Sequence, residues 1–121
     1  MSWRFDPGSS VSGQIVSSLR IKILTGEYNA GSQFPTVRSL AMELGVNPNT
    51  VQKALTVLET EGLLVSRTTV GRFVTEDETV IEQALKALKI SFMESALNKA
   101  NELGVTYAEF SDFIKEREGM Q

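Results

Sequence analysis

The order of local signals between residues 36 and 72 constrains the fold of this chain more than any other feature. Thr36 is a favoured N-cap for a short helix, which Gly45 is placed to end. Asn47 supplies a second N-cap, and Pro48 stands at the first position of the following helix, where a missing N–H costs nothing. The sequence therefore predicts two helices joined by a tight turn.

Two short β-favouring runs follow the second predicted helix. Residues 63–65 (LLV) and 73–74 (FV) flank a segment in which Gly71 can adopt a positive φ, so we expect a hairpin. Helix, turn, helix and hairpin is the order of a winged helix-turn-helix, whose second helix places its N-terminal residues against base edges in the major groove of DNA. The pattern therefore indicates DNA binding.

The residues that this arrangement would bring to DNA are mostly polar or basic. Asn and Gln can pair with adenine N6 and N7, Thr can hydrogen-bond and offer a methyl group to thymine, and Lys and Arg can contact phosphate or guanine. The candidate DNA-binding residues are Thr36, Arg38, Asn47, Asn49, Thr50, Gln52, Lys53, Arg67, Gly71 and Arg72.

Each candidate also has a purely structural interpretation. Asn47 is first of all a helix cap, and Asn49 and Thr50 lie in a first helical turn, where polar residues are common. A lone Lys or Arg is usually a solvated surface charge. The four candidate cations nevertheless come from three separate elements that this motif would bring to one face, which favours contact with DNA.

A further helix is predicted upstream of the motif. Between about residues 10 and 25, apolar side chains recur every three or four positions, and Gly26 marks the end of the pattern. Residues 27–35 are rich in turn formers and are predicted to be a connector.

Residues 76–121 are predicted to form a helical tail. A long amphipathic helix ends at Gly104, and a last helix starts with a capping box between Thr106 and Glu109. The tail is too short to enclose a metabolite, and its apolar stripe is longer than the last helix can cover, so we expect a homodimer interface. The alternative is that the stripe packs only on the winged domain of its own chain. The candidate dimerisation residues are Ile81, Leu85, Leu88, Phe92, Ala96, Phe110, Phe113 and Ile114.

Composition argues against several function classes. The 121 residues include no Cys and no His, so we expect no metal site, no cofactor and no enzyme activity. Glu59 and Glu61, the nearest approach to a pair of catalytic carboxylates, are two apart on a helix and do not face each other. No apolar run is long enough to span a membrane or resembles a signal peptide, and we therefore expect a cytoplasmic protein.

The net charge of -3 is unevenly distributed along the chain. Residues 1–75 carry seven Lys and Arg against five Asp and Glu, whereas residues 76–121 carry five against ten. Contact with phosphate depends on a local basic face, so the acidic sum is only a weak argument against DNA. We expect a mainly α fold with a small β-hairpin (α+β), divided into a winged helix-turn-helix domain, residues 1–75, and a helical dimerisation region, residues 76–121.

The chain also resembles a known family. The DNA-binding domain of GntR-family bacterial transcription regulators resembles this chain at residues 31–41 (GSQFPTVRSLA), 44–51 (LGVNPNTV), 54–55 (AL), 58–59 (LE), 61–63 (EGL) and 71–74 (GRFV). The Asn-Pro-Asn-Thr-Val turn and the short tail are most similar to the YtrA-like branch. The resemblance implies a homodimer that binds operator DNA through Arg38, Asn49, Thr50, Gln52 and the wing around Gly71.

Two positions depart from the pattern of that family. Ala30 stands where its members usually have Pro, which should loosen the connector. The wing tip, Thr68-Thr69-Val70, stands where they usually carry more glycine and a lysine. The remaining cations of the wing are Arg67 and Arg72.

The leading interpretation is a sequence-specific DNA-binding transcription regulator, most simply a repressor, that binds a palindromic operator as a homodimer. The alternative is a winged-helix protein-interaction module without direct DNA readout. Regulation remains open among an unknown small-molecule effector held between the two chains, a partner protein, and control by expression alone.

Overall fold

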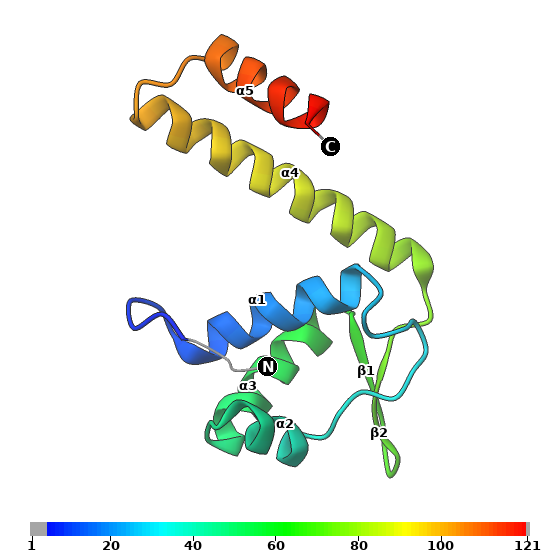
Figure 1. The fold of residues 1–121 in the computed structure, drawn as a ribbon. Coiled ribbons are helices and arrows are strands. Elements are labelled where there is room, and N and C mark those ends of the chain that lie inside the picture. Colours follow the sequence, from blue (N-terminus) through cyan, green and yellow to red (C-terminus); the bar gives the residue numbers. More distant parts are fainter. Residues whose placement is uncertain (1–4, 121) are drawn as a thin grey trace. The chain divides into compact units, whose positions relative to one another are not determined.

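The computed structural model describes residues 5–120 and contains five helices and one antiparallel hairpin in that range (Figure 1). The elements are α1 (Val11–Leu24), α2 (Val37–Leu44), α3 (Pro48–Thr60), β1 (Leu64–Arg67), β2 (Gly71–Val74), α4 (Glu78–Glu102) and α5 (Tyr107–Gly119). The expected fold class is confirmed. No helix among these residues combines the length and the apolar character needed to cross a bilayer.

The chain divides into two compact units, and the division lies inside α4, between Leu85 and Lys86. Each unit is described by itself. The domain boundary that the sequence indicates at residue 75 stays a prediction. Residues 1–4 of the first predicted region and residue 121 of the second lie outside the described residues.

Side-chain caps set the ends of the paired helices. The Thr36 hydroxyl accepts a hydrogen bond from Ser39 N at 3.0 Å, and the Asn47 carbonyl oxygen accepts one from Asn49 N at 2.8 Å. Gly45 ends α2 with a φ of 68°, a left-handed conformation that glycine adopts without a steric penalty. Both predicted helix starts and the stop between them are confirmed.

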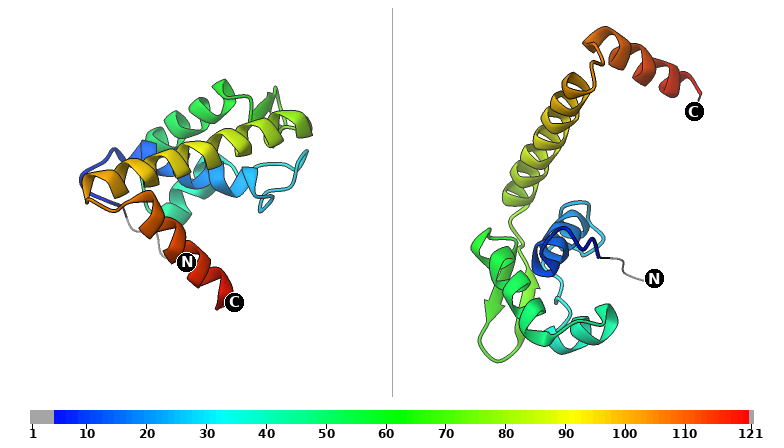
Figure 2. Two further views of the ribbon diagram at one scale, coloured as in Figure 1. Left: turned by 90° about the horizontal axis from the view of Figure 1, so that it is seen from above. Right: turned by 90° about the vertical axis from the view of Figure 1, so that its left-hand side faces the viewer.

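α3 is the centre of the first unit, since it packs against α1, α2 and β1. Its inner face is completely buried, and the apolar stripe predicted for α1 is buried with it, except for a partly exposed Val11. The largest fully buried side chains are Ile15, Leu19, Ile23, Leu40, Val51, Leu55, Leu58, Leu63 and Val74. Figure 2 shows the hairpin projecting as a wing from one side of the three helices.

The hairpin strands are longer than predicted, because β1 continues to Arg67 and β2 starts at Gly71. The antiparallel register pairs Leu64 with Val74, and Ser66 with Arg72. The three residues between the strands, 68–70, form the wing tip.

The connector before α2 is not a simple loop, because it pairs with β2. Gly31 N donates to Val74 O at 3.0 Å, Val74 N donates to Ser32 O at 2.9 Å, and Phe34 N donates to Arg72 O at 2.8 Å. The Phe34 side chain is buried. This pairing, which the sequence did not predict, gives the wing a third extended segment and anchors it to the helices.

The second unit consists of the C-terminal part of α4 and the whole of α5 (Figure 1). The loop that joins these helices contains Gly104 in a left-handed conformation. The predicted capping box is present: the Thr106 hydroxyl accepts from Glu109 N, and the Glu109 carboxylate accepts from Thr106 N, each at 3.1 Å. Within this unit only Ala100 is buried among the described apolar side chains, so the two helices leave most of their apolar surface exposed.

We predict that Ala30→Pro stabilises the protein. Ser32 N donates to Asn29 O at 3.1 Å, and Gly31 has a φ of 79°, which makes residues 29–32 a type II turn with Ala30 at the position that favours Pro. Ala30 N–H donates no hydrogen bond within residues 5–120, so the substitution loses none.

Urea unfolding should show a gain of about 0.5 to 1 kcal/mol in the free energy of unfolding. The matched Ala30→Gly variant should lose stability instead. A lower stability of the Pro variant would contradict the turn assignment.

Candidate nucleic-acid interface

The outer face of α3 carries polar side chains that are free to meet a ligand. Val51, Ala54, Leu55 and Leu58 turn inward, so the helical repeat turns Asn49, Gln52, Lys53, Thr56 and Thr60 outward, and all five of these are exposed. The Asn49 side-chain amide has no hydrogen-bond partner within residues 5–120. Its donor and acceptor remain available for a base edge.

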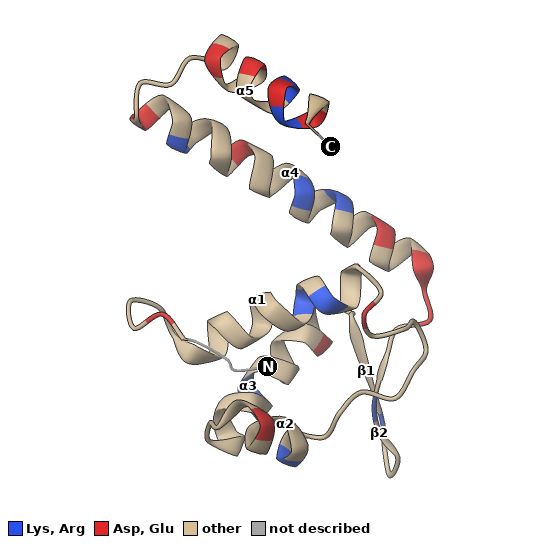
Figure 3. Cartoon of the chain, viewed as in Figure 1, with Lys and Arg blue, Asp and Glu red and all other residues tan. Residues whose placement is uncertain are grey.

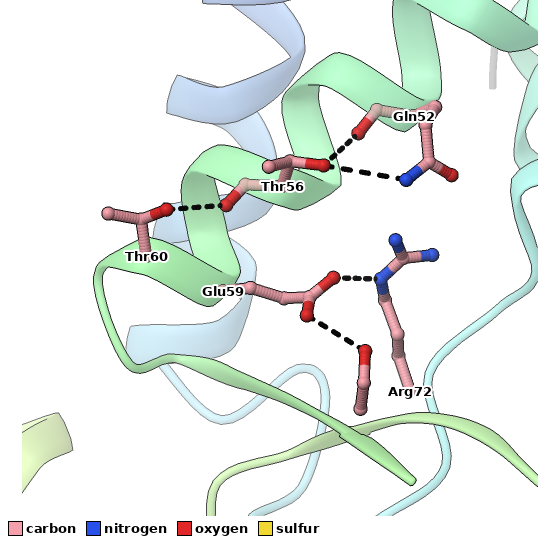
Figure 4. Close-up of polar contacts among 6 residues, drawn as sticks. Gln52, Thr56, Glu59, Thr60 and Arg72 are labelled. Carbon is pink, nitrogen blue, oxygen red and sulfur yellow. Dashed lines mark hydrogen bonds and ion pairs between the residues drawn. The ribbon is translucent and has the colours of Figure 1, made fainter. Parts of the chain in front are cut away.

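Threonines continue the polar face toward the C-terminal end of α3 (Figure 4). The Thr56 hydroxyl donates to Gln52 O at 2.9 Å and lies 3.4 Å from Gln52 Nε2, while the Thr60 hydroxyl donates to Thr56 O at 3.0 Å. Thr56 was not among the candidates from the sequence. Extending the exposed face by one helical turn from Gln52 would have found it.

Three of the candidates, Thr36, Asn47 and Gly71, have structural roles in the first unit, and a fourth, Thr50, is only partly exposed. The side-chain oxygens of Thr36 and Asn47 are engaged as helix caps. Thr50 is half-buried and points to the side of α3 rather than along the outer face. Gly71 has a φ of 109°, which allows the chain to enter β2 from the wing tip.

The cations of the first unit do not share one environment. Arg38 is exposed at the start of α2 and makes no side-chain interaction within the described residues. Lys53 lines a shallow hollow beside α1 together with Ser17 and Arg20, on the side of α3 away from the wing. Figure 3 shows the basic segments of α2 and of the hairpin on the same edge of the unit.

The wing cations are both paired. Arg67 places its guanidinium carbon 4.6 Å from the centre of the Phe73 ring and its Nη2 3.6 Å from Glu76 Oε1, yet more than half of its side chain stays exposed. Arg72 turns back toward α3, where its Nε donates to the Glu59 carboxylate. Only Arg67 therefore extends into solvent near the wing tip.

Glu59 is the centre of a small polar cluster between α3 and the wing (Figure 4). One of its oxygens accepts from Arg72 Nε, and the other accepts from the Ser66 hydroxyl at 2.8 Å. The Arg72 hydrogen bond, helped by that of Ser66, holds the pKa of Glu59 below its usual value, although partial burial acts in the opposite direction.

Glu61, the other carboxylate near the end of α3, is paired as well. It accepts from Nε of Arg20 at 2.8 Å and from Nη2 of the same side chain, which ties the end of α3 to α1. Glu59 and Glu61 thus serve two different ion pairs, one toward the wing and one toward α1.

The tail candidates fall into two groups. Phe92, Ala96, Phe110 and Ile114 line one open apolar groove of about 530 Å³ between α4 and α5, and Phe113 lines a second, of about 490 Å³, on the other side of Phe110. Ile81, Leu85 and Leu88 line neither groove and are half-buried along α4. Met93 and Leu97 also line the first groove.

Comparison with known proteins identifies the family. Residues 11–74, from the start of α1 to the end of β2, match the family described as bacterial regulatory proteins, gntR family. The chain belongs to the GntR family. The resemblance inferred from the sequence is confirmed, and the expected function class, a transcription regulator with a winged helix, is confirmed with it.

The similarity of this GntR protein to others extends beyond the matched domain. It is 31% identical to the HTH-type transcriptional repressor YtrA of Bacillus subtilis over 93% of its own length and 89% of that protein. A GntR family transcriptional regulator from Listeria monocytogenes has the same fold, with a TM-score of 0.86, 31% identity, and coverage of 93% of this chain and 98% of the other. The similarity includes the tail, as expected for the YtrA-like branch.

A second similar structure contains DNA. The DNA-binding domain of AraR, in complex with operator ORX1, superposes with a TM-score of 0.56 at 26% identity and covers 62% of this chain and 95% of that one. The fold of the first unit is therefore one that holds operator DNA in that related structure.

The lowered pKa of Glu59 predicts a pH dependence of stability in this GntR protein. The ion pair should contribute about 1 kcal/mol near neutral pH. Because the pKa is depressed in the folded state, this contribution is present above the ordinary Glu pKa of about 4.3 and disappears as the pH falls through the lower folded value.

Urea unfolding of the wild type and of Glu59→Gln should therefore differ from about pH 5 to pH 7, and the difference should shrink as the pH falls below the ordinary Glu pKa and through the lower folded value. A difference that stays constant across this range would show that the carboxylate charge is not the cause.

Proposed function

We propose that this protein is a sequence-specific transcription regulator, most simply a repressor, that binds a two-fold symmetric operator as a homodimer. The observation that carries the proposal is the outer face of α3, which leaves the Asn49 amide unpaired and exposed beside an anchored wing. The family membership and the operator complex of AraR support the same assignment.

In this proposal Asn49, Gln52 and Thr56 read base edges in the major groove, because they are the outward uncharged polar residues in the first three turns of α3. Arg38 and Lys53 contact phosphates on either side of that helix, and Arg67 does so from the wing. Thr36 and Asn47 contribute to DNA binding indirectly, because their side-chain oxygens are engaged as caps that fix the starts of α2 and α3.

The second unit supplies the homodimer interface. Phe92 is 72% exposed and Leu103 is 74% exposed, although both are large apolar side chains. Apolar surface of this size, lining grooves on both sides of α5, is typical of a protein–protein interface. A second copy of the unit is the partner that a two-fold operator requires.

The remaining properties follow from the family. As a bacterial transcription regulator, this protein would act in the cytoplasm, and its proposed role requires no catalytic activity. A small-molecule effector, where one acts, would bind between the two chains, where the open apolar grooves of the second unit offer a surface.

The proposal is tested by selection of double-stranded DNA from a random-sequence library with the full-length protein. We expect enrichment of an inverted repeat that gives a salt-dependent gel shift. Failure to enrich any sequence, with binding equal for all duplexes, would favour the protein-interaction alternative over direct readout.

We predict that Asn49→Ala and Lys53→Ala weaken DNA binding in different ways. Asn49→Ala should cost about 1 to 3 kcal/mol on the selected operator and relax the preference at one base pair. Lys53→Ala should weaken selected and random DNA alike and reduce the salt slope by about one. Fluorescence anisotropy at several salt concentrations measures both effects. Equal weakening of both duplexes by Asn49→Ala would remove its base-reading role.

We predict that Phe92→Glu breaks the homodimer. A carboxylate in an apolar interface must be desolvated without a partner, which costs several kcal/mol. Sedimentation velocity should show a dimer for the wild type at micromolar concentration and a monomer for the variant, with reduced operator affinity. Asn98→Glu, at an exposed polar position of α4 outside both grooves, is the matched control and should stay dimeric. A monomeric wild type would contradict the interface.

A further inference from the structure

A single carboxylate joins α3 to both strands of the wing. Glu59 Oε1 accepts from Arg72 Nε on β2, and Glu59 Oε2 accepts from the Ser66 hydroxyl on β1 at 2.8 Å (Figure 4). Ser66 and Arg72 are directly opposite each other in the hairpin register. The wing is therefore held to α3 at one cross-strand pair, with each oxygen of the carboxylate bonded to a different strand.

The bond from Arg72 uses Nε and leaves the rest of the guanidinium free. Neither Nη group donates to an acceptor within residues 5–120. In Figure 4 these terminal nitrogens lie on the side of Arg72 that faces Gln52, a residue of the outer face of α3. Only 19% of the Arg72 side chain is exposed, so its direction is fixed by packing as well as by the ion pair.

The position of Glu59 is unfavourable for DNA binding if charge alone matters. A carboxylate beside the outer face of α3 repels phosphates, and its removal should then strengthen binding. If the carboxylate instead orients a cation, its removal should weaken binding. The two explanations thus predict effects of opposite sign.

We propose that Glu59 is a positioning residue for DNA binding. It fixes the wing against α3 and turns Arg72 so that the two Nη groups donate to a backbone phosphate of the operator. Arg72, in addition to Arg67 and in place of the Thr68-Thr69-Val70 tip, then contacts the anionic DNA backbone from the wing. The proposal rests on the proposed function, because it requires that α3 and the wing meet DNA together.

The test uses the full-length protein and the duplex that the wild type selects, with anisotropy titrations at several salt concentrations. Glu59→Ala should weaken operator binding about tenfold, and Glu59→Gln, which keeps one acceptor oxygen, should weaken it less. Arg72→Gln should weaken selected and random DNA alike and lower the salt slope by about one. Adding Glu59→Ala to Arg72→Gln should cause a smaller loss than Glu59→Ala causes alone, since the part of its effect that acts through Arg72 is already gone and only the hydrogen bond from Ser66 remains to be lost.

Glu43→Gln is the matched control, because Glu43 is an exposed acid on α2 whose side chain makes no hydrogen bond or ion pair within the described residues. It should bind as tightly as the wild type or slightly more tightly. Unchanged or tighter binding by Glu59→Ala, additive losses in the double variant, or an unchanged salt slope for Arg72→Gln would each overturn the proposal. Because wild-type binding to the selected duplex is measured alongside, these results are distinct from a failure of DNA binding itself.

Discussion

The burial of one face of α3 is the interaction on which the first unit depends. Val51, Leu55 and Leu58 are fully buried where this helix meets its neighbours, which fixes its rotation about its own axis. Because successive turns of a helix repeat every 3.6 residues, fixing the inner face also decides which side chains point to solvent. The exposed amides of Asn49 and Gln52 owe their position to the same packing. The residues proposed to read DNA and the residues that stabilise the core therefore lie on opposite faces of one helix.

Much of the fold could be predicted because its boundaries are set locally. The side chains of the caps Thr36, Asn47 and Thr106 accept hydrogen bonds from backbone N–H groups only two or three residues away. Each cap can therefore be recognised from a few consecutive residues of the sequence. Gly45 and Gly104 end helices for an equally local reason, the low cost of a left-handed backbone. Periodicity indicated the apolar stripe of α1 without reference to any distant residue.

The features that were not predicted depend on contacts between distant residues. Pairing of the connector with β2 joins Gly31 to Val74, and nothing near Gly31 indicates it. The role of Arg72 likewise depends on Glu59, 13 positions away and on a different element. The sequence suggested a free cation near the wing tip, whereas the structure gives a paired one that faces α3. In the tail, periodicity placed Leu88 and Phe92 on one stripe, but only Phe92 lines a groove against α5.

The central claim is that two outer faces of α3, related by a two-fold axis, read one operator. Hydroxyl-radical footprinting on the selected duplex, with the number of bound chains counted by analytical ultracentrifugation, tests it most directly. Two chains per duplex and two equivalent protected half-sites, with centres about one helical turn of DNA or a multiple of it apart, are the expected result. One chain per duplex, or a single protected patch without symmetry, would contradict it.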